Sequence, residues 1–352
     1  MLAYLRVNNE QLISSNNMTT VEPAMIEKPN IFSFATTELS QDAFIAWLLA
    51  WADLRYESVD AQLHGCARKL IAAFFAKHGK PVPHFTEVTV TRQSKNIDVL
   101  CELDGTFAIV IEDKTHTDAH SNQLAKYLAD IQGRGYQSYN TLAIYFKTGD
   151  QTCYKAIYSN GFQPFSRRDF LDVLEAEAGT SNAIFHDYLA WLQHWDTRVE
   201  AYRTKPFEKW DGYAWIGFYK ALKEQLGEGN WGYVPNQSGG FRGFWCCFQD
   251  VLHVQLVDNR ELRFRIDVPD VTQRAAKRRE WFNKIVKHSE AFGLKTKKPA
   301  RFGNGQSMVV AVFDGEDFRQ TDQNGHVDLD ATVRLINQAK ALLTSLTPEP
   351  AK

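Results

Sequence analysis

Residues 107–114, which read Phe-Ala-Ile-Val-Ile-Glu-Asp-Lys, constrain the fold of this chain more than any other segment. The first five are apolar on both faces of an extended strand, so we predict a central strand that is covered on both sides. The run then ends in three charged residues, and buried charges are costly unless they are paired or bound to a metal ion. The segment therefore predicts a sheet covered on both faces, with a group of paired or metal-binding charged residues at the end of its central strand.

The flanking sequence predicts a mixed α/β fold. Residues 97–103 form a second predicted strand, joined to 107–114 by the turn signal Asp104-Gly105. Residues 1–30 are polar and aperiodic and are expected to form a flexible N-terminal arm. Further strands are expected at 86–93 and 141–149, and helices at 37–54, 61–78, 119–132, 167–177 and 182–202.

The character of the chain changes near Pro206, and we expect residues 205–352 to form a smaller α+β C-terminal domain. Helices are predicted at 213–226, 272–292 and 328–345, and strands at 231–235, 241–248, 252–258, 261–268 and 307–313. The stretch Phe241-Arg242-Gly243-Phe244-Trp245 mixes arginine with aromatic rings. It is read either as a buried strand or as rings that stack on nucleic-acid bases.

Cysteine and hydropathy patterns exclude several classes of protein. The five cysteines are odd in number and include no Cys-x-x-Cys pair, which argues against a disulfide framework or a zinc site. No apolar run approaches the length of a membrane span, and the N-terminus shows no secretion signal. We therefore expect a cytoplasmic protein with no membrane contact.

Polar residues around the central strand form a candidate site. Glu112 and Lys114 share one face of the strand, whereas the Asp113 side chain points to the other. A two-residue turn would place Asp98 on the wrong face, but a three-residue turn at 104–106 pairs residue 98 with residue 112. We therefore predict an odd turn length or a bulge between Asp98 and Glu112.

Two carboxylates at this spacing suit Mg²⁺, with the main-chain carbonyl of Asp113 as a further ligand. Lys114 is expected to orient a water or to offset charge on the phosphate. Gln123 and Tyr127 are four residues apart, so they share a helix face from which both can donate to phosphate oxygens. A lone Glu-x-Lys also fits an ordinary cross-strand ion pair, and only the ordered set is distinctive.

With Ile97-Asp98, Ile111-Glu112-Asp113-Lys114 and Gln123 through Tyr127, the chain resembles the PD-(D/E)XK nuclease superfamily and its RecB-like branch with a Gln-x-x-x-Tyr motif. The resemblance implies a restriction-endonuclease-like central mixed sheet flanked by helices, over residues 31–204. It implies hydrolysis of phosphodiester bonds with Mg²⁺ or Mn²⁺. Asp98 and Glu112 would be metal ligands, Lys114 the catalytic lysine, and Glu38 an outer ligand. Glu38 also fits an ordinary first-turn acid.

The net charge of -2 hides a basic segment, because residues 271–301 hold ten Lys or Arg against two acids. Arg274, Lys277 and Arg278, with Lys126 of the first domain, are candidate nucleic-acid contacts. The alternative is a solvated helix face followed by a basic loop. We expect DNA in preference to RNA as the partner, and a second copy of the chain or a separate ATPase as further candidates.

Three interpretations of function stay open at this point. The first is an active metal-dependent nuclease, in bacterial defence or DNA repair. The second is a catalytically silent nuclease-like module that grips nucleic acid or a protein partner. The third is an unrelated α/β protein whose acidic residues and lysine form a structural network.

Overall fold

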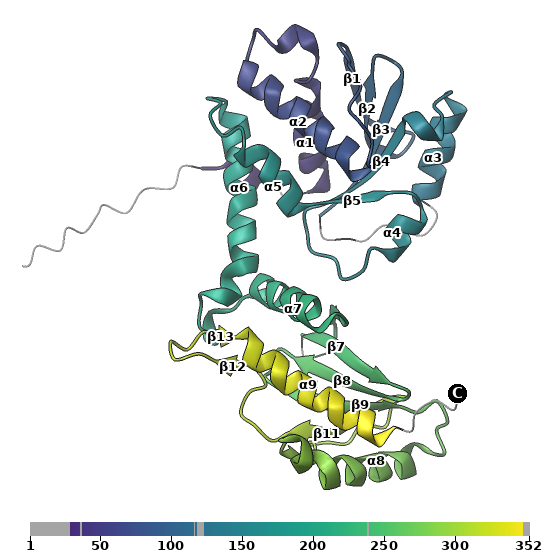
Figure 1. Cartoon of the computed structure of the whole chain (residues 1–352), viewed down its shortest axis with the longest axis vertical. Helices are drawn as coiled ribbons and strands as arrows, with labels where there is room; N and C mark the ends of the chain where they lie inside the picture. The colour runs from purple at the N-terminus through teal and green to yellow at the C-terminus, as the bar shows by residue number, and fades with distance from the viewer. Residues whose placement is uncertain (1–28, 36, 116, 118–122, 238, 348–352) are drawn as a thin grey trace, which may run out of the picture.

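The computed structural model describes residues 29–35, 37–115, 117, 123–237 and 239–347. The predicted arm at 1–30 lies outside the described residues except for its last two positions. The chain forms two units, each built on its own sheet and its own apolar core, and they lie one above the other with α7 (Gly212–Leu226) between the two sheets (Figure 1). Helix α6 (Ala183–Glu200) runs along the side of the first unit, from beside α5 toward α7 (Figure 1). Among the described residues, no helix is both long and apolar enough to cross a membrane.

The first unit is a mixed five-stranded sheet in the order β1-β2-β3-β4-β5. Strands β1 to β3 pair antiparallel, whereas β3, β4 and β5 pair parallel. Strand β3 has neighbours on both sides, which confirms the central strand that its apolar run predicts. The strands span Val88–Ser94 (β1), Ile97–Leu103 (β2), Phe107–Lys114 (β3), Thr141–Lys147 (β4) and Gln163–Ser166 (β5).

Helices cover both faces of this sheet (Figure 1). Ile109 and Ile111 pack with α1, α2, α5 and α6, whereas Ala108 and Val110 pack with α3 and α4 on the other face. This alternation turns Glu112 and Lys114 toward α3. The helices are α1 (Glu38–Ala50), α2 (Ala61–Lys77), α3 (Gln123–Gly133), α4 (Lys155–Ser159), α5 (Arg167–Glu175) and α6.

The mixed α/β class is confirmed, and most predicted elements lie within a few residues of their expected bounds. The short elements α4 and β5 were not predicted, because four or five residues carry too little periodicity to register. Brief 3-10 helices join the longer elements at Ile31–Ser33, Leu54–Tyr56, Ser138–Asn140, Ala201–Arg203, Phe207–Lys209 and Ser289–Phe292.

The second unit is a six-stranded antiparallel sheet in the order β10-β11-β9-β8-β7-β6, with its helices packed around one common core. A small β12–β13 pair precedes the last helix. The elements after α7 are β6 (Asn230–Val234), β7 (Phe241–Gln249), β8 (Leu252–Val257), β9 (Leu262–Asp267), α8 (Arg274–His288), β10 (Thr296–Lys297), β11 (Ser307–Phe313), β12 (Gln320–Thr321), β13 (Val327–Asp328) and α9 (Leu329–Leu346).

Candidate active site

The β2–β3 hairpin has the register that the candidate site requires. Leu103 lies opposite Phe107 and Val99 opposite Ile111, so residues 104–106 form a three-residue turn. Continuing this register places Asp98 opposite Glu112, on the same face of the sheet. The predicted odd turn length is therefore confirmed, and the Asp98 carboxylate also accepts a hydrogen bond of 2.9 Å from the Asp113 main-chain N–H.

The Lys114 ammonium lies among oxygens of every residue that the sequence nominates as a metal ligand. Its Nζ is 2.7 Å from Glu112 Oε1 and donates to the main-chain carbonyl of Asp113 at 2.8 Å. The nearest carboxylate oxygens of Asp98 and Glu38 each lie 3.8 Å from the same nitrogen. Four separate oxygens thus converge on one cation at the end of the central strand.

Burial and neighbouring charges shift the pKa values of Glu112 and Lys114. Glu112 is fully buried, and burial, together with the neighbouring Asp98 charge, raises its pKa to about 7. Desolvation alone lowers the pKa of Lys114, but the hydrogen bond and charge of Glu112, with the charges of Asp98 and Glu38, outweigh it and raise that pKa. Lys114 therefore stays protonated at neutral pH.

Helix α3 brings Gln123 and Tyr127 over Glu112, as their spacing predicts. Gln123 Nε2 donates to Glu112 Oε2 at 3.3 Å and also contacts the Tyr127 hydroxyl. Burial, with the nearby Glu112 and Asp98 charges, raises the pKa of Tyr127 above its usual range, so its phenol remains a hydrogen-bond donor. These two side chains fix the orientation of the Glu112 carboxylate.

Glu38, the first residue of α1, approaches the cluster from the opposite layer. One of its carboxylate oxygens accepts from the Thr115 main-chain N–H at 3.0 Å and from the Thr117 hydroxyl at 2.9 Å. The other oxygen is the one that faces Lys114. Glu38 therefore ties the segment after β3 to the start of α1.

Two buried residues behind the site, Gln41 and Asp42, were missed by the sequence analysis. Gln41 Nε2 donates to Asp113 Oδ1 at 2.5 Å, and its carbonyl oxygen accepts from the Thr148 and Tyr188 hydroxyls. Both residues follow Glu38 at the helical spacings i+3 and i+4, and this spacing was the available signal.

Asp42 and Asp113 form a buried carboxyl pair on this side of β3. Burial and the Asp98 charge raise the pKa of Asp42 to about 6, and burial and the Asp42 charge raise the pKa of Asp113 well above its usual range. One oxygen of each carboxyl is buried without a donor from another group, which suits a proton shared between the two.

The family model of the PD-(D/E)XK nuclease superfamily matches residues 29–209. The chain belongs to the PD-(D/E)XK nuclease superfamily. The match covers the five-stranded sheet with its helices and ends before α7, so it does not include the second unit. No match was found among curated proteins or among solved structures. The RecB-like branch and the Gln-x-x-x-Tyr motif stay predictions.

Nucleases of this superfamily typically use divalent metal ions, and the donors present here fit such an ion. Asp98 and Glu112 supply carboxylates and Asp113 a carbonyl, which are hard oxygen ligands of the kind that Mg²⁺ and Mn²⁺ prefer. Glu112 Oε1 is buried, and its neighbour is the Lys114 ammonium, so this oxygen already accommodates a positive charge. Within the described part of the chain, no cluster of three His, Cys, Asp or Glu side chains is arranged around a metal position.

The predicted nucleic-acid contacts fall in two places. Lys126 is exposed on α3, the helix that also carries Gln123 and Tyr127. Arg274, Lys277 and Arg278 lie on α8, at the end of the second unit that is remote from the first sheet (Figure 1). Arg274 donates to the carbonyls of Val268, Pro269 and Asn304, and Arg278 to Gly303 and the Asn304 side chain.

Lys277 pairs with Glu280 at 3.1 Å on the same helix. The two arginines therefore hold the loops at 268–269 and 303–304 against α8, which uses donors that phosphate contacts would need. Binding of nucleic acid by this helix stays a prediction.

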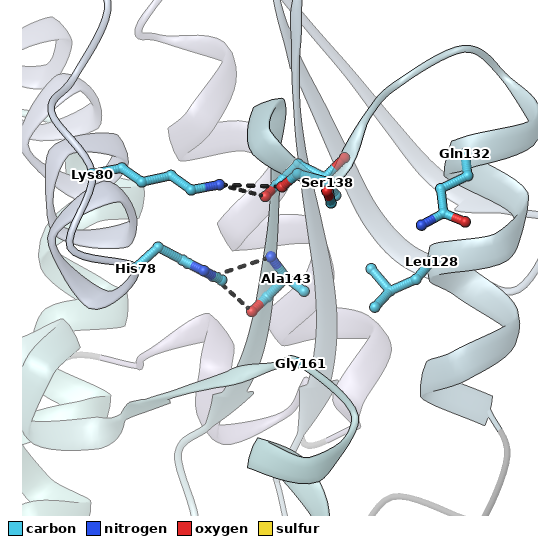
Figure 2. A pocket seen from close by; sticks show the side chains of 8 residues that line it. His78, Lys80, Leu128, Gln132, Ser138, Ala143 and Gly161 are labelled. Atoms are coloured by element: carbon cyan, nitrogen blue, oxygen red, sulfur yellow. Dashed lines mark hydrogen bonds between the residues drawn. The ribbon is translucent and has the colours of Figure 1, made fainter.

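A cavity of about 190 Å³ in the first unit lies apart from the residues around Lys114. Figure 2 shows His78 and Lys80 reaching across it to the beginning of β4. His78 Nε2 lies 3.2 Å from the main-chain N of Ala143, and Lys80 Nζ donates to three carbonyls at 138, 139 and 141. Burial lowers the pKa of His78, which favours the neutral ring, and Nε2 also lies 3.1 Å from the Ala143 carbonyl oxygen. These contacts bind backbone groups of the 3-10 helix at 138–140 and of the beginning of β4, and the cavity faces the opposite end of the strands from Lys114.

Proposed function

We propose that this chain is a metal-dependent nuclease that hydrolyses phosphodiester bonds in DNA with Mg²⁺ or Mn²⁺. The observation that carries the proposal is the convergence of Asp98, Glu112 and the Asp113 carbonyl on the Lys114 ammonium. Membership of the superfamily supports metal-dependent phosphodiester hydrolysis. The choice of DNA and of these two metals is our inference.

Asp98, Glu112 and the Asp113 carbonyl are the groups that would hold the metal ion. When bound, such an ion polarises a phosphate and acidifies a water. Lys114 keeps its proton at neutral pH, so it brings a fixed positive charge to the point where charge develops on the phosphate. Because it lies in a largely desolvated position, this charge acts more strongly than it would in water.

The remaining residues keep this arrangement in place. Gln123 holds one oxygen of Glu112, and the protonated phenol of Tyr127 lies beside it as a donor for a phosphate oxygen. Gln41 holds the side chain of Asp113 on the other face of the strand, which fixes the direction of the Asp113 carbonyl. Glu38 anchors the segment that leaves the site.

Cleavage assays on single- and double-stranded DNA and RNA test the proposal. We expect cleavage with Mg²⁺ or Mn²⁺ and none in EDTA, and a loss of about 10²-fold or more for Asp98→Asn and for Lys114→Met. Asp172→Asn and Lys205→Met change exposed residues of the same types and should leave cleavage unchanged. Cleavage that survives Asp98→Asn would refute the site.

A second candidate is a nuclease-like module that binds nucleic acid or a protein without cutting. The position of Lys114 favours it, because the ammonium already fills the space between the carboxylates. Binding of DNA with no cleavage under either metal, and with the same affinity in Asp98→Asn, would support this second candidate over the first.

A further inference from the structure

A cavity of about 300 Å³ lies where the two units meet, and we call it the junction groove. Loop 150–152, which follows β4, forms one wall, and α7 with strands β6 and β7 forms the other. Its chemically distinctive lining residues are Asp150, Thr152, Tyr219, Trp231, Tyr233 and Arg242. The volume lies at the lower end of the range for ligand sites, which often occur where domains meet.

Hydrogen bonds hold the two walls together around Thr152. The Thr152 hydroxyl lies 3.2 Å from the Asn230 side-chain oxygen and accepts from the Trp231 main-chain N–H at 3.4 Å. The Thr152 carbonyl accepts from Lys223 of α7. The first strand of the second unit is thus tied to the loop that leaves the nuclease sheet, and the groove is a fixed feature of the junction.

Two aromatic rings of the groove each have a cation beside them. The Tyr233 side chain is 55% exposed, and the Arg242 guanidinium lies 5.7 Å from its ring centre. Trp231 is half-buried, with Lys223 Nζ 5.8 Å from its ring. Exposed rings beside cations are the features with which proteins bind unpaired nucleic acid, because bases stack on the rings while phosphates contact the cations.

The charges at the groove favour a polyanion. Lys220, Lys223 and Arg242 provide three positive charges, against the carboxylates of Asp150 and Asp258. Asp150 lies 2.8 Å from the buried Arg167, which also pairs with Asp196 at 2.8 Å, and 3.3 Å from Lys220. Arg242 lies 4.0 Å from Asp258, at the outer limit of an ion pair, and its side chain is 39% exposed, so a phosphate can reach the guanidinium from solvent.

The groove also lies near Lys114. Lys147, the last residue of β4, pairs with Lys114 in the parallel register, and Asp150 follows three residues later. Neighbouring strands are about 4.8 Å apart and an extended chain advances at most about 3.6 Å per residue. The edge of the groove is therefore within about 16 Å of Lys114, and α7 faces the nuclease sheet across the junction (Figure 1). This separation is about five nucleotides or fewer.

We propose that the junction groove binds an unpaired nucleic-acid strand, with a base stacked on Tyr233 and phosphates beside Arg242, and delivers that strand to Lys114. The inference rests on the proposed nuclease function and adds a substrate class to it. A duplex cannot bind in this way, because its bases already stack on both faces.

Fluorescence anisotropy with a labelled oligothymidylate tests the proposal on the full chain in EDTA, where no cleavage is expected. Tyr233→Leu should weaken binding about tenfold, and Tyr233→Phe, which keeps the ring, should remain within about twofold of the wild type. Arg242→Gln should reduce the slope of log affinity against log salt by about 0.7. Tyr158→Leu changes a tyrosine that is equally exposed, at 56%, on α4 and should have no effect. Thermal unfolding checks that each variant is folded.

The outcomes separate this inference from the proposed function. Tyr233-dependent binding without cleavage of any substrate would support the groove and overturn the nuclease. Cleavage by the wild type together with unchanged binding by Tyr233→Leu would overturn the groove and leave the nuclease standing. If Tyr233→Leu weakened the binding of a blunt duplex and of the single strand equally, that result would also overturn the groove. Repeating the measurement with an oligouridylate compares RNA with DNA as the bound strand. Binding of either strand that depends on Tyr233 supports the proposal.

Discussion

The stability of the protein should fall as Glu112 ionises, and Glu112→Gln should remove that dependence. Burial and the Asp98 charge raise the pKa of Glu112 from 4.5 to about 7 in the folded protein. The folded state thus holds the Glu112 proton more tightly than the unfolded chain. This contribution to stability is fully present below about pH 4.5 and is lost as the pH rises to about 7. Each pH unit in that window is worth about 1.4 kcal/mol, so the loss is about 3 kcal/mol.

Urea unfolding in EDTA at several pH values from 4.5 to 8 measures this effect. Relative to Glu112→Gln, which is neutral throughout, the wild type should lose about 3 kcal/mol of unfolding free energy across the range. Glu57→Gln, which removes an exposed carboxylate, should track the wild type to within about 0.5 kcal/mol. If the difference in unfolding free energy between the wild type and Glu112→Gln stayed constant with pH, the argument would be refuted. The pH dependence of stability could not then arise from the burial of an ionising Glu112.

Three further changes probe the metal site, its support and the junction. Mg²⁺ should raise the thermal unfolding midpoint of the wild type but not of Asp98→Asn, and an equal rise in both would contradict metal binding at Asp98. Gln41→Leu leaves the buried Asp113 without its amide donor and should cost about 2–3 kcal/mol in urea unfolding, whereas a cost below about 0.5 kcal/mol would mean that Gln41 is dispensable. Gly217→Ala places a methyl group 2.0 Å from a main-chain oxygen of α6 and should destabilise the protein by about 1–3 kcal/mol. The control Gly65→Ala, with open space around it, should be neutral or stabilising by up to about 1 kcal/mol. Calorimetry measures both changes.

Local rules of strand geometry suffice to predict the core of the site. The apolar run at 107–111 requires a central strand, and the alternation of side chains then places Glu112 and Lys114 on one face. The parity of the turn at 104–106 decides whether Asp98 joins them, and the hairpin register agrees with that prediction. These inferences hold because each depends on residues that are close in sequence.

The supporting residues depend on contacts between distant parts of the chain. Gln41 meets Asp113 across 72 residues and Tyr188 across 147, so no local pattern could pair them. The sequence nominated Arg274 and Arg278 as nucleic-acid contacts on charge alone, whereas the folded chain brings backbone carbonyls to both. A charged residue can be recognised in a sequence, but its hydrogen-bond or ion-pair partner is decided by the packing of the folded chain.

The junction groove belongs entirely to the tertiary structure. Its aromatic and basic residues are visible in the sequence between 219 and 242, but the loop at 150–152 that completes it comes from the other unit. The sequence by itself therefore determined the strand, the turn and the residues at their ends, because these follow from the pleat and the turn. Which side chains gather behind and beside them was decided only when helices and loops from both units packed against that sheet.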